Sequence, residues 1–342
     1  MSAAAVNGGP LLEVEDLVVR YRVPRGLSGA ILRRPERFVH AVSAVSLAVR
    51  RGEMVALVGE SGCGKTTTAQ AILRLVQADS GSVRFDDTEV TTLPSDELRR
   101  LRRRMQIIYQ DPYESLDPRF RVSETVSEPL VIHGVGSRAE RRHAVAHALE
   151  RVGLAPAELF VDRFPHELSG GQRQRVAIAA SLVLEPDLLV ADEPVSMLDV
   201  SVRAGILAIL DGLRDRGLAV LMITHDLSTA ARFADRICVM YLGRIVEEGP
   251  AREVIESPRH PYTQALLSVV PRRDPRRRVE PQILRGETPN PIDVPSGCRF
   301  HPRCPLFASG EAARLGIEER CRSDDLALHD VAPEHRAACH AL

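Results

Sequence analysis

The sequence predicts an α/β fold, in which a mostly parallel β-sheet is covered by helices on both sides. Short apolar runs bounded by turn or charged residues recur at residues 54–58, 107–109, 188–191 and 219–224. Runs of this kind are typical of strands buried on both faces. Segments with helical periodicity separate them, as parallel strands require, because each pair needs a long crossover connection.

A smaller sheet is expected at the N-terminus. Residues 11–22 and 38–49 alternate or run apolar on either side of an insert rich in Pro, Gly and Arg, residues 23–37. This pattern predicts two antiparallel strands joined by a long exposed loop.

The middle and the end of the chain differ from these strands. A helix should follow the strand at residues 54–58, since apolar positions fall on one face at helical spacing: Ala69, Ile72, Leu73 and Val76. Arginine-rich helical periodicity then predicts an inserted helical subdomain at about residues 111–185. The run from Pro271 to Arg278 and several later prolines predict a linker before a cysteine-bearing tail. The arginines could touch lipid or RNA, but the interruptions by Asp and Pro favour a solvated surface.

The composition describes an ordinary globular protein. The 342 residues include 45 basic and 46 acidic side chains, with a formal net charge of -1, so no nucleic acid partner is expected. No apolar stretch approaches the roughly 20 residues of a membrane-spanning helix. The N-terminus lacks the features of a secretory signal, which places the chain in the cytoplasm. The six cysteines are then reduced thiols or metal ligands.

A phosphate-binding loop follows the first core strand. The sequence Gly59-Glu-Ser-Gly-Cys-Gly-Lys65-Thr66 contains the only lysine among the 45 basic residues. Glycines let backbone N–H groups surround phosphate oxygens, and the next helix directs its positive end at the same anion. The expected nucleotide-binding residues are Gly59, Ser61, Gly62, Cys63, Gly64, Lys65, Thr66 and Thr67.

An acidic pair follows a later core strand. Lys65 would bridge the outer phosphates, and the Thr66 hydroxyl would ligate Mg²⁺. Asp192 would complete the magnesium site from the carboxyl end of its strand. Glu193 would orient or deprotonate the attacking water.

The segment Leu168-Ser-Gly-Gly-Gln172 completes a set of motifs that resembles the ABC ATPase family over residues 11–250. The resemblance implies a P-loop NTPase (RecA-like) core with an antiparallel β subdomain, an inserted helical subdomain and a small C-terminal Cys-containing extension. The nucleotide-binding domain would span residues 1–250, and the extension residues 251–342.

The resemblance also implies roles for single residues. Tyr21 would stack on adenine, Gln110 would sense Mg²⁺ and the membrane partner, and His225 would contact the terminal phosphate. The signature residues Ser169, Gly170, Gly171 and Gln172 would contact ATP held by an opposite subunit, with Asp199 at the subunit interface. ATP would thus hold two subunits together, and hydrolysis would part them.

Three further sequence segments resemble the ATP-binding subunits of bacterial oligopeptide and dipeptide importers. They are residues 110–118, residues 260–267 and the segment from Pro295 to Phe300. The resemblance implies a second ATPase subunit, forming a heterodimer, two permease subunits and an extracytoplasmic solute-binding protein. The chain would lie peripherally on the cytoplasmic face of the membrane. Importers of nickel chelates or other small solutes, and soluble non-transport ABC ATPases, are the alternatives.

Four cysteines lie in the tail, at Cys298, Cys304, Cys321 and Cys339. Some members of the peptide-importer group carry a 4Fe-4S cluster on similarly placed cysteines, and four thiolates suit such a cluster. Zinc is the alternative, because His301, His335 and His340 lie nearby in the sequence. A tail without metal also remains open. Cys63 and Cys238 are interpreted as small packing residues.

Overall fold

The computed structural model describes residues 9–24, 36–111, 116–196, 198–270, 282–284 and 286–342. Most of the insert at residues 23–37, residues 112–115 and the arginine run from Pro271 to Arg278 lie outside the described residues. The chain divides into two compact units. The first comprises residues 1–12, 48–54 and 85–223, and the second comprises residues 13–47, 55–84 and 224–342.

The first unit contains parallel strands and the helices that follow them. Strand β7 (Leu188–Asp192) pairs in parallel with β6 (Met105–Ile108) on one side and with β8 (Ala219–Thr224) on the other. Every residue of β7 and β8 is buried, as the continuous apolar runs predict. The expected strand at residues 107–109 begins earlier, at Met105, because Met105 and Gln106 pair with Leu188 and Leu189.

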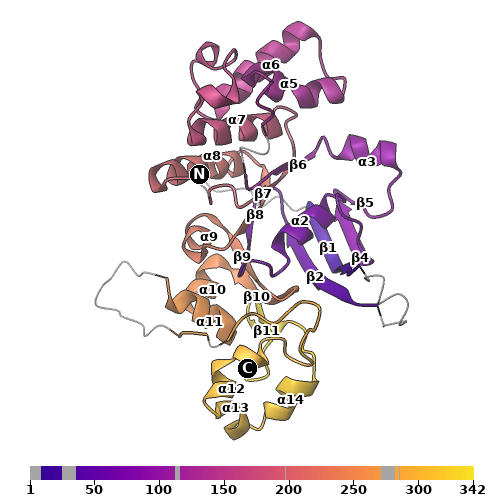
Figure 1. The fold of residues 1–342 in the computed structure, drawn as a ribbon, viewed down its shortest axis with the longest axis vertical. Helices are drawn as coiled ribbons and strands as arrows, with labels where there is room; N and C mark the ends of the chain where they lie inside the picture. The colour runs from indigo at the N-terminus through magenta and orange to yellow at the C-terminus, as the bar shows by residue number, and fades with distance from the viewer. Residues whose placement is uncertain (1–8, 25–35, 112–115, 197, 271–281, 285) are drawn as a thin grey trace. The chain divides into compact units, whose positions relative to one another are not determined.

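The predicted helical subdomain consists mainly of three helices that pack on one another, as Figure 1 shows. They are α5 (Val122–Ile132), α6 (Arg138–Arg151) and α7 (Gly170–Leu182), with short 3-10 turns at Ala157–Leu159 and Pro165–Glu167. The unit also contains the two-residue strand β5 (Thr88–Glu89), helix α3 (Ser95–Leu101) and the amphipathic helix α8 (Val200–Arg214).

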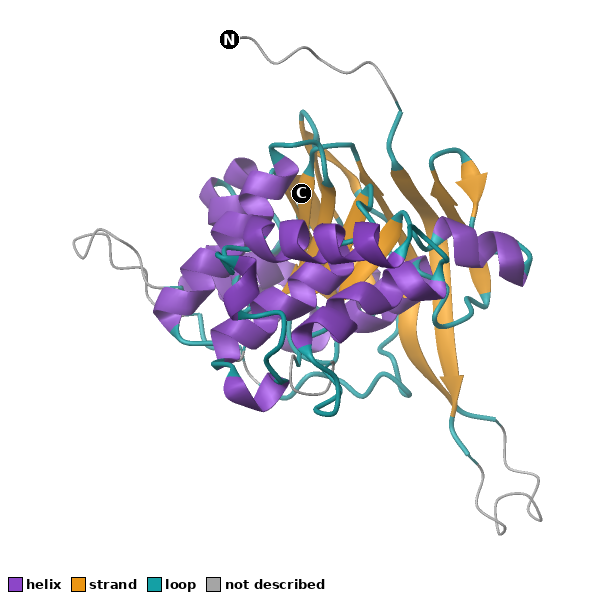
Figure 2. Ribbon diagram, turned by 90° about the horizontal axis from the view of Figure 1, so that it is seen from above, coloured by secondary structure: helices purple, strands orange, loops and turns teal. Residues whose placement is uncertain are grey.

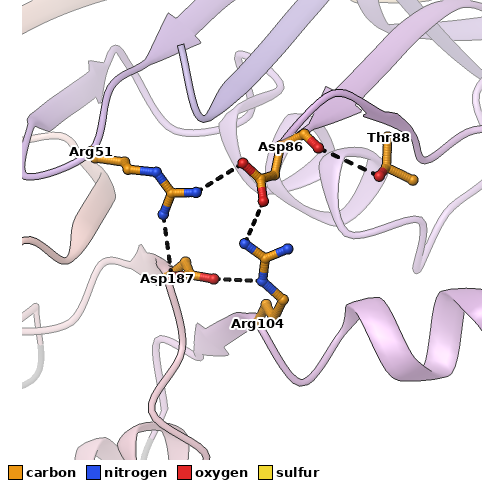
Figure 3. A network of polar contacts seen from close by, with 5 residues as sticks. All are labelled: Arg51, Asp86, Thr88, Arg104 and Asp187. Carbon is orange, nitrogen blue, oxygen red and sulfur yellow. Dashed lines mark hydrogen bonds and ion pairs between the residues drawn. The ribbon is translucent and has the colours of Figure 1, made fainter. Parts of the chain in front are cut away.

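A ring of four alternating charges joins separate segments of the first unit (Figure 3). Arg51 contacts Asp86 at 2.8 Å and Asp187 at 3.3 Å. Arg104 contacts the same two carboxylates at 2.6 and 2.5 Å, and its guanidinium lies over the ring of Phe85. Each acidic partner is therefore shared by two arginines, which orders the ring better than an isolated surface pair.

The second unit contains the predicted antiparallel hairpin of β1 (Leu12–Arg22) and β2 (Phe38–Val49). The Val23 N–H donates to Arg37 O at 2.9 Å, and the Asp16 N–H donates to the Ser46 hydroxyl at 2.9 Å, so the two strands run in opposite directions. Figure 2 shows them as the long pair that leads into a grey segment. Strand β4 (Ser80–Phe85) lies on the other side of β1.

A second group of strands in this unit carries the phosphate loop. The fully buried β3 (Met54–Val58) pairs in parallel with β9 (Arg236–Tyr241). Strand β9 continues antiparallel into β10 (Arg244–Pro250), then β12 (His335–Ala337) and β11 (His329–Ala332). The helices in the described part of this unit are α2 (Lys65–Ile72), α9 (Leu227–Phe233), α10 (Ala251–Glu256), α11 (Pro261–Ser268), α12 (Pro305–Ala308), α13 (Glu311–Arg314) and α14 (Glu318–Ser323), with a 3-10 turn at His301–Arg303.

The cysteine-bearing tail is more ordered than its composition suggests. The sequence predicts a linker before this tail and marks no strand within it, yet the tail adds two strands to β10. The fully buried Glu247 on β10 contacts His335 Nε2 at 2.7 Å and accepts hydrogen bonds from the N–H groups of Arg259 and His260. These buried polar contacts hold the tail against β10.

None of the helices in the described part of the chain has the length and apolar content needed to cross a bilayer.

Candidate nucleotide site

The phosphate loop, residues 59–66, connects β3 to α2 and curls around the side chain of Lys65. The Lys65 ammonium donates to Gly59 O at 2.8 Å and to Glu60 O at 3.0 Å. Gly62 and Gly64 have φ angles of 78° and 107°, a backbone region that glycine enters without steric cost. The loop therefore places a cation at its centre.

Close backbone contacts explain two of the glycines. A Cβ atom on Gly59 would lie 2.2 Å from Met240 O, and one on Gly64 would lie 2.1 Å from Ala41 O. Any larger residue would push the loop away from β9 or β2. Sequence reasoning missed Ala41 and Met240, because nothing in a single sequence marks a residue that only limits space.

Helix α2 begins inside the loop. Lys65 is its first residue and Gly64 its N-cap, with no side chain capping the first turn. The first-turn N–H groups of an α-helix lack intrahelical partners, so this end favours an anion. Ser61 and Thr66 are exposed, Thr67 is half-buried, and Cys63 is buried. Burial raises the pKa of the Cys63 thiol, which suits the packing role expected for it.

Two other expected ligand residues belong to the second unit. Tyr21 lies on β1 with 39% of its surface exposed, which leaves ring area for stacking. His225 is exposed and directly follows β8.

The first unit brings Gln110 and Glu193 together. Asp192 is the buried last residue of β7, and Glu193 follows it. The Gln110 side-chain amide donates to Glu193 Oε2 at 3.1 Å. Glu193 adopts a φ of 44°, unusual for a residue with a side chain, while its N–H donates to Ile223 O at 2.9 Å. The backbone thus fixes the position of the Glu193 Cα atom, and the hydrogen bond from Gln110 fixes the position of the carboxylate.

The signature residues form the N-terminus of α7. Ser169 is the N-cap: its hydroxyl accepts from Gln172 N, and the Gln172 side chain accepts from Ser169 N at 3.0 Å. This reciprocal capping box leaves other first-turn N–H groups available for an anion. A Cβ on Gly171 would lie 2.5 Å from a Val202 methyl, so Gly171 lets α7 approach α8. Asp199 is the exposed N-cap of α8.

The four tail cysteines line one small cavity of about 20 Å³. Its remaining walls are mostly apolar and aromatic, including Phe300, Leu306, Phe307 and Ile317. Burial raises the pKa of Cys298 to about 12 and that of Cys339 to about 11. Cys238 lies elsewhere, buried in β9, and none of the six cysteines, all of them in the described part of the chain, forms a disulfide.

The described residues contain no group of three or more His, Cys, Asp or Glu side chains that could hold a metal ion as they stand. Of the histidines considered as zinc ligands, His301 and His340 line the cavity, whereas His335 contacts Glu247.

A strand, a glycine loop closing on a lysine and a helix N-terminus are the parts of a phosphate-loop nucleotide hydrolase. A family model described as "ABC transporter" matches residues 42–196. A second, described as "Oligopeptide/dipeptide transporter, C-terminal region", matches residues 246–309. The chain belongs to the ABC transporter family of ATP-binding proteins, and it is an ATPase.

Curated relatives resemble almost the whole chain. A putative peptide import ATP-binding protein of Brucella ovis is 45% identical over 96% of this chain and 97% of its own length. A probable peptide ABC transporter ATP-binding protein of Sinorhizobium fredii is 42% identical over 96% of this chain and 89% of its own length. A glutathione import ATP-binding protein of Pectobacterium atrosepticum is 48% identical over 83% of this chain and 45% of its own length.

Solved structures confirm the predicted fold class. A dimeric ATP-binding cassette in a post-hydrolysis state with ADP and Pi superposes with a TM-score of 0.61 and 30% identity, over 70% of this chain and 99% of that one. The structure of cbiO1 from Clostridium perfringens also gives a TM-score of 0.61 and 30% identity, over 72% of this chain and 91% of that one.

Proposed function

We propose that this chain is the ATP-hydrolysing subunit of an importer of oligopeptides or dipeptides. The observation that carries the proposal is the pairing of an intact phosphate loop with a C-terminal segment that matches the oligopeptide/dipeptide transporter model. The names of the relatives support it, since they include both peptide and glutathione import. Glutathione is itself a small peptide, so these names agree on a substrate class.

In this proposal the phosphate loop and Lys65 bind the phosphates of ATP, and Tyr21 stacks on its adenine. Thr66, Asp192 and Gln110 would hold Mg²⁺, because hydroxyl, carboxylate and amide oxygens are ligands that Mg²⁺ accepts. Bound Mg²⁺ would offset the negative charge of the outer phosphates. Glu193 would act on the attacking water, a role that its contact with Gln110 supports by fixing the carboxylate.

The signature segment would act on a second ATPase subunit, in a heterodimer. The α7 N-terminus, with Ser169 through Gln172, offers N–H groups to the terminal phosphate of ATP bound by that subunit. His225 would contact the terminal phosphate within its own chain, and Asp199 would lie at the interface. ATP binding would then close the pair, and hydrolysis would open it.

The rest of the assembly follows from the same proposal. Residues 1–250 would form the nucleotide-binding domain and residues 251–342 the extension. Two permease subunits would receive the motion, a solute-binding protein would deliver the peptide, and the chain would lie on the cytoplasmic face of the membrane.

We also propose a 4Fe-4S cluster on Cys298, Cys304, Cys321 and Cys339. The residues suit the group, since four thiols line one cavity enclosed largely by apolar side chains. The donor set is the reason for preferring a cluster to zinc, because four thiols line the cavity and four thiolates are the ligands that such a cluster takes. When bound, a cluster would supply covalent cross-links between the three segments that carry these cysteines.

The functional proposal is tested with the ATPase purified together with its permeases. ATP hydrolysis should rise when the solute-binding protein is added with short peptides, and Glu193→Gln should abolish that rise. Stimulation by a nickel chelate but by no peptide or glutathione would contradict the peptide assignment.

The cluster proposal is tested on protein purified without oxygen. About four iron and four sulfide per chain are expected, and Cys321→Ser should lower both. Cys238→Ala is the matched control, because Cys238 lies outside the cavity, and its iron content should equal that of the parent. One zinc per chain and no sulfide would contradict the cluster proposal and support a zinc site instead.

A further inference from the structure

The phosphate loop is held by the C-terminal extension through the side chain of Glu60. Arg303 donates to both carboxylate oxygens of Glu60, at 2.7 and 3.1 Å, and the Thr288 hydroxyl donates to one of them at 2.9 Å. Arg303 also donates to Thr288 at 3.1 Å. A two-pronged guanidinium–carboxylate contact fixes orientation as well as distance.

The backbone of the loop has a second attachment to the extension. The Glu60 N–H donates to the Tyr262 hydroxyl at 3.0 Å. Tyr262 is fully buried, and its ring packs against those of Tyr241 and Phe300, with centroids 4.7 and 5.4 Å away. Because these rings cannot shift independently, the hydroxyl gives the loop a fixed point.

The ion pair is sheltered from water. Arg303 is 9% exposed, and the Glu60 side chain is 28% exposed. Burial raises the pKa of Glu60, but the hydrogen bonds from Arg303 and Thr288 outweigh this effect and leave the pKa below its ordinary value. Loss of Glu60 would leave the buried Arg303 charge without this partner, and loss of Arg303 would leave a partly exposed carboxylate beside Thr288, so the geometry of the loop depends on both members.

The same residues join the cysteine cavity. Arg303 immediately precedes Cys304, and both Cys304 and Phe300 line the cavity. Phe300 contacts Tyr241, over whose ring the Arg303 guanidinium lies at 5.9 Å. One packed cluster therefore connects the cavity wall with the phosphate loop.

We propose that Arg303 is a positioning residue for the phosphate loop and couples the packing of the cysteine-lined segment to nucleotide binding. The proposal rests on the proposed nucleotide site. Because coupling between two sites is reciprocal, nucleotide on the loop must also stabilise the cysteine-lined segment. The extension is then a working part of the ATPase.

The test measures MgADP affinity of the full chain by titration calorimetry. Arg303→Ala should raise the Kd about tenfold, or about 1.4 kcal/mol. Arg303→Lys should recover only part of the affinity, because a lysine keeps the charge but loses the fork. Arg252→Ala is the matched control: Arg252 is an exposed arginine of the extension that pairs with Glu256 outside the cavity lining, and its loss should leave the Kd unchanged.

A second measurement separates positioning from general stability. Hydrogen exchange of residues 298–307 should slow on adding MgADP to the parent protein, and this slowing should disappear in Arg303→Ala. If Arg303→Ala does not fold, Glu60→Ala removes the same contact from the loop side and should show the same loss of affinity.

The two proposals fail differently. A parent protein that does not bind MgADP would overturn the nucleotide site itself. A parent that binds it, beside folded Arg303→Ala or Glu60→Ala protein of equal affinity, would overturn the positioning role alone.

Discussion

Replacing Gly59 with alanine tests the steric basis of the phosphate loop. The added Cβ would lie 2.2 Å from Met240 O, where separations under 3.0 Å are essentially never found. The obstacle is a backbone atom in β9, so the loop has to retreat by about 1 Å. A misplacement of that size in a reacting site costs about 100-fold in rate. We therefore expect kcat/KM for ATP to fall about 100-fold.

Gly62→Ala is the natural comparison for this variant. A Cβ on Gly62 meets nothing within 4 Å, but its φ of 78° costs an alanine about 1–2 kcal/mol. Gly62→Ala should lower the melting temperature while keeping more activity than Gly59→Ala. ATPase rates and thermal melts of both proteins give the result. Activity of Gly59→Ala equal to that of Gly62→Ala would refute the steric explanation.

Three further predictions concern other parts of the molecule. Glu193→Gln should keep MgATP affinity and lose nearly all turnover, because it removes only the carboxylate that acts on water; undiminished steady-state hydrolysis would contradict that role. Arg104→Ala breaks two contacts of the charged ring and should lower the free energy of unfolding by about 1 kcal/mol at low salt and by less at high salt. Arg252→Ala breaks one exposed pair with Glu256 and should change the free energy of unfolding little. Equal denaturation midpoints for the two variants would contradict a stabilising role of the ring. Because the pKa of Glu60 is lowered from its ordinary value of 4.5, the ionised Glu60 stabilises the fold fully above pH 4.5, and this stabilisation is lost as the pH falls below 4.5. The difference in free energy of unfolding between the parent and Glu60→Gln, measured by urea denaturation, should therefore shrink below pH 4.5 and stay constant above it.

Local patterns predicted most of the elements that form the site. Met54–Val58 and Ala219–Thr224 are strands with the expected bounds, because a continuous apolar run needs no distant information to be recognised. The helix after the loop begins where expected but ends at Ile72, short of Val76. Arg74 follows the helix with a φ of 52°, the left-handed conformation in which helices often end. Glycine usually occupies such a position, so an arginine there gives no sequence signal of the helix end.

Long-range contacts could not be predicted in the same way. Glu60 and Arg303 are 243 residues apart, and each alone has the appearance of an ordinary surface charge. The pairing of the tail with β10 is another long-range feature, because it involves the buried contact between Glu247 and His335, which are 88 residues apart. The sequence gives Gln110 a role only through resemblance, and the 3.1 Å contact between its amide and Glu193 is seen only in the structure.

The phosphate loop is limited by three segments that are distant in sequence. Ala41 on β2 restricts it at Gly64, Met240 on β9 restricts it at Gly59, and Arg303 holds Glu60. The first two contacts exclude side chains and so fix where the loop cannot go, whereas the third is attractive and fixes where it rests. Attractive contacts can weaken without a clash; Gly243, whose N–H donates to Cys63 O at 2.8 Å, supplies one, and Arg303 and Tyr262 supply those of the extension. The extension is therefore one segment through which loop geometry can be adjusted. A change in the cysteine-lined segment should therefore alter nucleotide affinity before it alters the fold of β3 or β9.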